Sequence, residues 1–178
     1  MPPVVIAILI MSAFAVDAIL PGNFYWLGIR PRTISGLTGI IFSPFLHANL
    51  KHLLSNLLPL VIMGCFVSAL APSLYFFRTL MLMVLSGGLT WLTSSSGVVI
   101  GASGLVFAYW SYLITNGFIS RRTKDLFVAL ITFLVYGAMI FSLFKIEQGV
   151  SWAGHFSGAV AGITLALQQR RKSTYFLK

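Results

Sequence analysis

The stretch Gly97–Tyr109, GVVIGASGLVFAY, leads from a short loop directly into an apolar helix. Ser103 stands at the junction, with Gly101 before it and Gly104 after it. Glycines remove side-chain bulk beside the hydroxyl, and the first turn of a helix has backbone N–H groups without intrahelical partners. Such donors can stabilise an oxyanion, so Ser103 is a candidate nucleophile. A serine before an apolar run also describes an ordinary helix N-cap, and this stretch alone leaves both interpretations open.

The composition places this stretch in a membrane protein. Hydrophobic residues make up 58% of the 178 residues, charged residues only 8%, and the mean hydropathy is +0.94. A soluble globule of this size cannot bury so many apolar side chains. Spans of about 20 apolar residues are the expected unit, and the chain has room for about six of them. The sequence therefore predicts an all-α membrane protein with a single domain over residues 1–178.

Six apolar segments are separated by turn, polar or basic residues. We expect spans at about 3–20, 46–70, 75–93, 103–116, 125–144 and 150–168. The fourth segment is short for a full span, so we expect a central helix that begins below the membrane surface. Residues 21–45 form the longest connection and contain the aromatic residues Phe24, Tyr25 and Trp26. Aromatic residues favour the membrane interface, so part of this first loop is expected to lie in the membrane.

Two histidines and an asparagine mark the start of the second segment, at His47, His52 and Asn56. Successive residues of a helix are about 100° apart, so His52 and Asn56 share one face. His47 is expected about 140° away from His52, facing a different element. A zinc site is the rival interpretation, but the spacing of the two histidines does not suit one helix face and no Cys, Asp or Glu is near. We therefore expect no metal and no other cofactor.

The sixth segment repeats small residues at intervals of four, at Gly154, Gly158, Gly162 and Ala166. One edge of the predicted helix is nearly bare, which permits another helix to approach closely. His155 stands beside this edge, where a neighbouring helix would meet its imidazole. A histidine satisfied by interhelical hydrogen bonds is one interpretation, and a general base is the other.

The distribution of basic residues predicts an orientation. With both termini in the cytoplasm, the cytoplasmic side carries eight of the twelve Lys and Arg residues, in agreement with the positive-inside rule. The second, fourth and sixth segments then all begin on the opposite side. His47, His52, Asn56, Ser103 and His155 are therefore expected at similar depth. Because the basic residues are scattered at segment ends, we expect no nucleic-acid partner.

These residues together suggest nucleophilic catalysis. A serine hydroxyl is a weak nucleophile near neutral pH and needs a base within hydrogen-bonding reach, which His155 can supply. The Ser103 N–H, the Asn56 amide and a His52 ring nitrogen can donate to a developing oxyanion. The acidic residues of the chain are Asp17, Asp125 and Glu147. Asp125 is expected on the opposite side and the other two need fortunate geometry, so a Ser–His dyad is the simpler arrangement.

Three motifs follow one another along residues 45–165. They are His-x4-His-x3-Asn at His47, His52 and Asn56, Gly-x-Ser-Gly at Gly101 to Gly104, and His-x2-Gly-x3-Gly at His155, Gly158 and Gly162. In this order, and on these segments, they resemble the motifs of the rhomboid family of intramembrane serine proteases. The resemblance is to the bacterial six-helix core type of that family.

The resemblance implies a role for each of these residues. Ser103 is the nucleophile, His155 the base, and His52 and Asn56 are oxyanion donors, while His47 is a structural histidine that holds the first loop. The implied partners are transmembrane protein substrates and the lipid bilayer. The implied location is a bacterial cytoplasmic membrane, with the site open to the side opposite the cytoplasm.

Two positions depart from the family pattern. Many members have a tyrosine four residues after the serine, which stacks on the catalytic histidine; Phe107 keeps the ring here but lacks the hydroxyl. Stacking on His155 is therefore expected to survive. Many members also have Trp-Arg in the first loop, where this chain has Thr38-Gly39. This replacement bears on how the first loop is anchored.

Two other functions remain open for a membrane protein with a polar cavity. A non-catalytic protein could use the cavity to bind transmembrane clients, and a small transporter could relay protons through the histidines. No inverted repeat or pair of broken helices supports the transporter. A soluble α/β hydrolase is excluded because no alternation of strands and helices surrounds Ser103.

Overall fold

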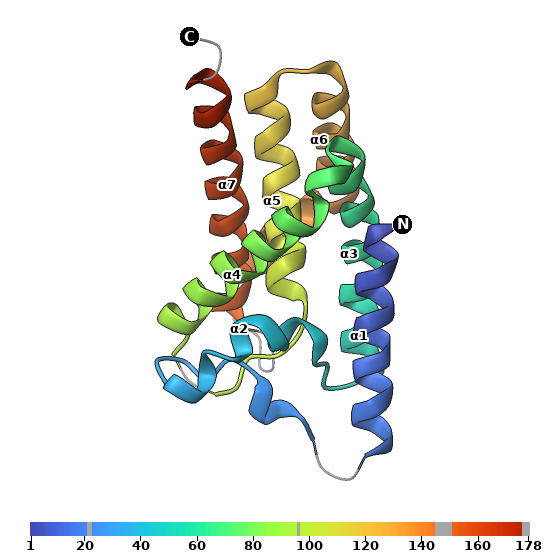
Figure 1. Cartoon of the computed structure of the whole chain (residues 1–178), viewed down its shortest axis with the longest axis vertical. Helices are drawn as coiled ribbons and strands as arrows, with labels where there is room; N and C mark the ends of the chain where they lie inside the picture. The colour runs from blue at the N-terminus through green and yellow to red at the C-terminus, as the bar shows by residue number, and fades with distance from the viewer. Residues whose placement is uncertain (21–22, 96, 145–150, 176–178) are drawn as a thin grey trace.

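The computed structural model describes residues 1–20, 23–95, 97–144 and 151–175, with the backbone alone for residues 170–175. Six long helices form a bundle within these residues: α1 (Pro2–Ile19), α3 (Leu50–Leu70), α4 (Tyr75–Thr93), α5 (Ser103–Ser120), α6 (Thr123–Tyr136) and α7 (Trp152–Tyr175). Figure 1 shows α4 crossing the bundle diagonally while α5 and α7 run nearly parallel to each other. The predicted all-α membrane bundle is confirmed.

Four stretches of this bundle are long and apolar enough to cross a membrane. They are α1, α3, α4 with its preceding turn η4 (Pro72–Leu74), and α6 with the 3-10 segment η5 (Gly137–Leu143) that follows it. Many of their large apolar side chains point outward; Ile8 and Phe133 are each 56% exposed, and Leu134 is 71% exposed. Lipid is the solvent that accepts such a surface, so the chain is an integral membrane protein.

The central helix of the bundle is α5. It is longer than predicted, because it continues to Ser120. Every residue from Leu105 to Leu113 is buried, since α3, α4, α6 and α7 all contact α5. A helix that is buried all round lies in the interior of a bundle. Ser103 begins this helix, so its backbone is placed by the core of the protein.

Glycines bring α7 against α5. A Cβ on Gly158 would overlap the carbonyl oxygen of Gly104, and a Cβ on Gly162 would overlap the carbonyl oxygen of Ala108. Neither position has room for a methyl group. The bare edge of the sixth segment is therefore the contact with α5, and this contact brings His155, about one turn before Gly158, to the start of α5.

The first loop folds into short turns, namely η1 (Tyr25–Leu27), η2 (Ile34–Gly36), α2 (Gly39–Phe42) and η3 (Ser43–Phe45). Arg32 anchors these turns to the carboxyl end of α4. Its guanidinium donates hydrogen bonds to the backbone carbonyl oxygens of Leu92, Ser94 and Ser95. A cation is favourable at this end of a helix because the last carbonyls lack intrahelical partners. Arg32 thus supplies an anchor for a loop that lacks the family's Trp-Arg.

Gly39 stands where many family members have the arginine of Trp-Arg, and the packing of this loop leaves no room for a side chain there. A Cβ on Gly39 would overlap the backbone of Gly28 and Ile29. The same part of the loop forms an isolated antiparallel bridge, in which Ile29 and Val99 exchange two backbone hydrogen bonds of 2.9 Å. The first loop is therefore packed directly on the chain that leads to Ser103.

Two predicted segments differ from the structure. The second helix begins at Leu50, because the Asn49 side chain caps it by accepting a hydrogen bond of 2.8 Å from the His52 N–H. The fifth segment is not one continuous α-helix, since α6 ends at Tyr136 and continues as η5. The predicted start of the sixth span, near residue 150, lies outside the described residues.

Candidate active site

One cavity collects residues from α3, α5, α6, η5 and α7. It has a volume of about 450 Å³, and its walls include His52, Asn56, Ser103, Phe107 and His155. The structure thus brings together the residues that the sequence placed at similar depth. Ligand pockets commonly have volumes of roughly 300–1,000 Å³, so the cavity is large enough to receive part of a peptide.

The loop before α5 places Ser103 at the edge of this cavity. Gly101 has a φ of +107°, and a Cβ there would lie 2.6 Å from His52 Nε2 and 3.7 Å from Asn56 Nδ2. Its N–H donates to the Ser43 carbonyl oxygen at 2.8 Å. Only glycine lets the backbone turn in this way beside the imidazole. The backbone just before Ser103 is therefore packed on both predicted donor side chains.

His47 holds the same loop. Its Nε2 accepts a hydrogen bond of 3.4 Å from the Ala102 N–H, and its ring packs edge-to-face against the His52 ring at a centroid distance of 5.0 Å. The predicted separation of the two histidines is wrong, because His47 precedes the helix that begins at Leu50. Burial, followed by the neighbouring His52, lowers the pKa of His47 from 6.5 to about 4. The ring is therefore neutral near pH 7, so Nε2 remains an acceptor.

His155 lies in the first turn of α7 and is 8% exposed. Phe107, about one turn after Ser103, stacks on its ring with centroids 4.3 Å apart and an interplanar angle of 21°. The predicted stacking is confirmed, and it sets the imidazole beside the start of α5. No hydrogen bond joins the Ser103 and His155 side chains in this part of the structure, which is common for catalytic pairs before a substrate binds.

Carboxylates are absent from the cavity walls within the described residues. Asp17 accepts a hydrogen bond of 2.8 Å from a backbone N–H of the first loop, and Asp125 lies in the first turn of α6. Glu147 lies outside the residues that the structure describes. In that same part of the chain, no group of three or more His, Cys, Asp or Glu side chains is placed to hold a metal ion. Among the residues that the structure describes, the cavity therefore offers a serine and a histidine with no charged third member.

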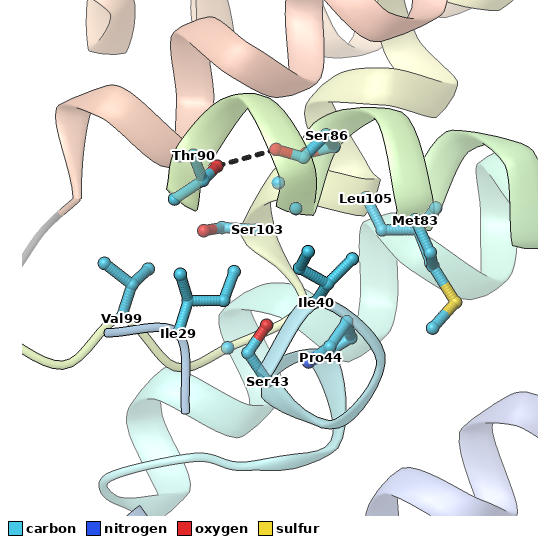
Figure 2. A pocket seen from close by; sticks show the side chains of 14 residues that line it. Ile29, Ile40, Ser43, Pro44, Met83, Ser86, Thr90, Val99, Ser103 and Leu105 are labelled. Atoms are coloured by element: carbon cyan, nitrogen blue, oxygen red, sulfur yellow. Dashed lines mark hydrogen bonds between the residues drawn. The ribbon is translucent and has the colours of Figure 1, made fainter. Parts of the chain in front are cut away.

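A second, small cavity lies behind Ser103, between the first loop and α4 (Figure 2). Its volume is about 20 Å³, which is the space that one water molecule needs. Ser43, Ser86 and Thr90 are among the polar residues in its lining, and Thr90 Oγ1 donates to the Ser86 carbonyl oxygen at 2.8 Å. Ser103 therefore lies between a large cavity and a water-sized one.

The residues that close the large cavity on its α6–η5 side were missed by sequence reasoning. Tyr136, Met139 and Ser142 line it. Their segment was predicted as a continuous α-helix, whereas a 3-10 segment has about three residues per turn and presents different side chains to one face. Gly137 at the break is the only local signal, and a single glycine in an apolar run does not identify a change of helix type.

A comparison with protein families decides what the chain is. Residues 35–172 match the family model described as Rhomboid domain. The chain belongs to the rhomboid family. The matched range contains all three motifs and every residue named above in the walls of the large cavity. Rhomboid proteins are in general intramembrane serine proteases.

Relatives of this rhomboid protein occur in mycobacteria. Uncharacterized proteins of Mycobacterium tuberculosis and Mycobacterium bovis are each 38% identical to it over 148 residues, and one of Mycobacterium leprae is 34% identical over 148 residues. Each match covers 78% of this chain. The chain spans about three fifths of the length of these relatives, 62% for the first two and 59% for the third. They support the family membership and assign no activity.

Proposed function

We propose that this rhomboid protein is a serine endopeptidase that cleaves transmembrane segments of membrane proteins. The observation that carries the proposal is that Ser103, His155, His52 and Asn56 all line the large cavity. A serine hydroxyl next to a neutral imidazole is the minimal pair of nucleophile and base. Side chains that can donate hydrogen bonds are needed in the same cavity to stabilise the oxyanion, and His52 and Asn56 fulfil that need.

In the proposed acylation, Ser103 Oγ attacks the carbonyl carbon of the substrate while His155 takes the hydroxyl proton. Collapse of the tetrahedral intermediate breaks the C–N bond, and His155 gives its proton to the leaving amine. The acyl group is then held as an ester on Ser103. A water molecule, activated by His155, hydrolyses this ester and restores the free serine.

Asn56 is well prepared to stabilise the oxyanion in this scheme. Its Nδ2 donates one hydrogen bond of 2.9 Å to the backbone carbonyl oxygen of His52. A side-chain amide has two N–H groups, so the second remains for a ligand. The bond to the preceding helical turn orients the amide in advance, which is how preorganised donors lower a barrier. We assign the other donors to the Ser103 N–H and a His52 ring nitrogen.

The surroundings of the cavity suggest the substrate class. The helices around it expose apolar side chains, so a substrate is expected to arrive through the lipid as a transmembrane helix. The carbonyls of an intact helix are occupied by its own hydrogen bonds. A substrate must therefore unwind locally, and we propose small or helix-breaking residues near the cleaved bond.

We further propose that both termini face the cytoplasm of a bacterium and that the large cavity opens to the opposite side. Arg121, Arg122 and Lys124 lie where α5 ends and α6 begins, which is the end of α5 away from Ser103. Cytoplasmic connections are enriched in such residues. The orientation therefore follows from the charge distribution.

Cleavage of a model transmembrane substrate in proteoliposomes tests the proposed activity. Ser103→Ala should reduce cleavage to the background rate without lowering the melting temperature, because it removes only the nucleophile. Undiminished cleavage by the variant would contradict the serine mechanism. A folded wild-type protein that binds the substrate helix, but neither cleaves it nor reacts with a fluorophosphonate, would instead support non-catalytic binding of clients.

A further inference from the structure

The carboxyl end of η5 is attached to the first turn of α7. Trp152 Nε1 donates a hydrogen bond to the Leu143 carbonyl oxygen. The preceding residue, Ser142, lines the large cavity together with His155, and its backbone carbonyl interacts with the imidazole. Trp152 and His155 are three residues apart, so they lie on the same side of α7. The end of η5 is thus bonded to Trp152 and lies beside His155, two side chains of one helical turn.

The geometry of a 3-10 segment makes such carbonyls available. Its hydrogen bonds join each N–H to the carbonyl three residues earlier, as between the Phe144 N–H and the Phe141 carbonyl oxygen at 3.1 Å. The carbonyls of the last turn have no partner within the segment itself. They can therefore accept from side chains of a neighbouring helix, as Leu143 does from Trp152.

His155 needs an acceptor of this kind. Its Nδ1 is buried and has no hydrogen-bond partner at normal distance and angle within the described residues. The Ser151 hydroxyl, a polar neighbour in the cavity, already accepts from the Gly154 N–H at 3.1 Å. Phe107 fixes the plane of the imidazole but cannot select the nitrogen that carries the proton. Within the described part of the chain, the Ser142 carbonyl is therefore the acceptor best placed to keep that proton on Nδ1.

We propose that Trp152 is a positioning residue for the base. Its hydrogen bond to Leu143 holds η5 against α7, so that the Ser142 carbonyl accepts from Nδ1–H of His155 and Nε2 is free to take the proton of Ser103. The inference rests on the proposed serine mechanism. A backbone carbonyl then performs the task of the carboxylate in a catalytic triad, which is to select the tautomer and the orientation of the imidazole.

Trp152→Phe tests this role, because phenylalanine removes the N–H donor and keeps an aromatic ring to stack on Phe156, as Trp152 does at a centroid distance of 5.3 Å. We expect kcat for a model transmembrane substrate to fall roughly 10- to 100-fold, the loss expected when a catalytic group is slightly misplaced. KM and the melting temperature should not change, and the labelling rate of Ser103 by a fluorophosphonate should fall with kcat. Trp26→Phe is the matched control and should alter none of these, because Trp26 is 58% exposed in the first loop.

The outcomes separate this inference from the proposed function. If Trp152→Phe keeps the wild-type kcat while His155→Ala slows the labelling of Ser103, the positioning role is overturned and the catalytic pair stays intact. A lower melting temperature with a raised KM and an unchanged kcat would also overturn it, since Trp152 would then support only the fold. If the folded wild-type protein is neither labelled nor able to cleave the substrate, the proposed function itself is overturned. A loss of kcat in Ser151→Ala, with none in Trp152→Phe, would transfer the orienting role to the hydroxyl of Ser151.

Discussion

Two walls of the large cavity, one formed by α5 and α7 and the other by α6 and η5, are built differently. On the α5–α7 wall, all residues from Leu105 to Leu113 are buried, and Gly158 and Gly162 have no room for a methyl group. On the α6–η5 wall, the buried residues of α6 are Val128, Ala129 and Thr132, and η5 has none. Close packing fixes the relative positions of groups, whereas sparsely packed segments open at low free-energy cost. The wall that carries Ser103 and His155 is therefore rigid, and the wall that faces them is the more easily displaced.

Gly158→Ala should have the largest effect, because it forces the rigid wall apart. Its new Cβ would overlap the Gly104 carbonyl, so we expect the free energy of unfolding to fall by at least about 2 kcal/mol, with loss of cleavage. Gly137→Ala is the same substitution on the other wall. Gly137 has a helical φ of −59°, and the nearest atoms to its added Cβ belong to Phe133, at 3.6 Å.

Gly137→Ala should therefore change the stability by no more than about 0.5 kcal/mol, or raise it slightly. Thermal unfolding in detergent measures both variants. Equal losses of stability at the two positions would contradict the difference between the walls.

Gly101→Ala should disturb the active site more than it disturbs the fold. Gly101 and Gly97 have φ values of +107° and +80°, so alanine is strained at both positions, at a cost of about 1–2 kcal/mol. At Gly101 the added Cβ also approaches His52 Nε2 to 2.6 Å, whereas nothing lies within 4 Å of it at Gly97. We expect similar melting temperatures but a kcat at least about tenfold lower for Gly101→Ala alone. Matching kcat values would show that the donors do not depend on this loop.

The loop that leads into the rigid wall should be held less firmly in acid, because His47 accepts a hydrogen bond from its Ala102 N–H. Its pKa of about 4 in the folded chain lies below its ordinary value of 6.5, so the unfolded chain binds the proton first as the pH falls. The stability contributed by the neutral ring is complete above about pH 6.5 and is lost progressively towards pH 4. Melting temperatures between pH 7 and pH 4 should fall less steeply in His47→Gln than in the wild type. Identical slopes would remove His47 as the cause.

Arg32→Gln should have the smallest effect, because the anchor of the first loop lies outside both walls. The variant loses the hydrogen bonds to the end of α4, which are largely exposed. We expect a loss of about 1 kcal/mol of stability and little change in kcat. Arg30→Gln is the matched control in the same loop and should leave the melting temperature unchanged. A loss of kcat comparable with that of Gly101→Ala would mean that the first loop positions the site directly.

Much of the rigid wall could be predicted from the sequence, because its signals are local. The four-residue spacing of Gly154, Gly158 and Gly162 identified the edge that packs on α5, and alternating spans placed Ser103 and His155 at one depth. The resemblance to the rhomboid family agreed with both inferences. The same resemblance implied that the Phe107 ring stacks on His155, as it does in the structure.

The remainder depended on backbone detail. Asn49 before an apolar run is an N-cap signal that predicts a helix start at Leu50 and places His47 outside the helix. The predicted angle between His47 and His52 was wrong because it assumed that the helix also includes His47. The bonds from Arg32 to the end of α4 and from Trp152 to Leu143 use backbone carbonyls. A carbonyl is present at every position, so no residue pattern reveals which one a side chain will reach.

The most direct test of the central claim is the labelling of Ser103 by a fluorophosphonate in proteoliposomes, compared between the wild type and His155→Ala. We predict that the wild type is labelled at Ser103 and that labelling of the variant is slower by roughly 10²- to 10⁴-fold, because the hydroxyl has lost its base. Equal melting temperatures would show that both proteins are folded. Equal labelling rates would contradict the claim that Ser103 and His155 act as a pair.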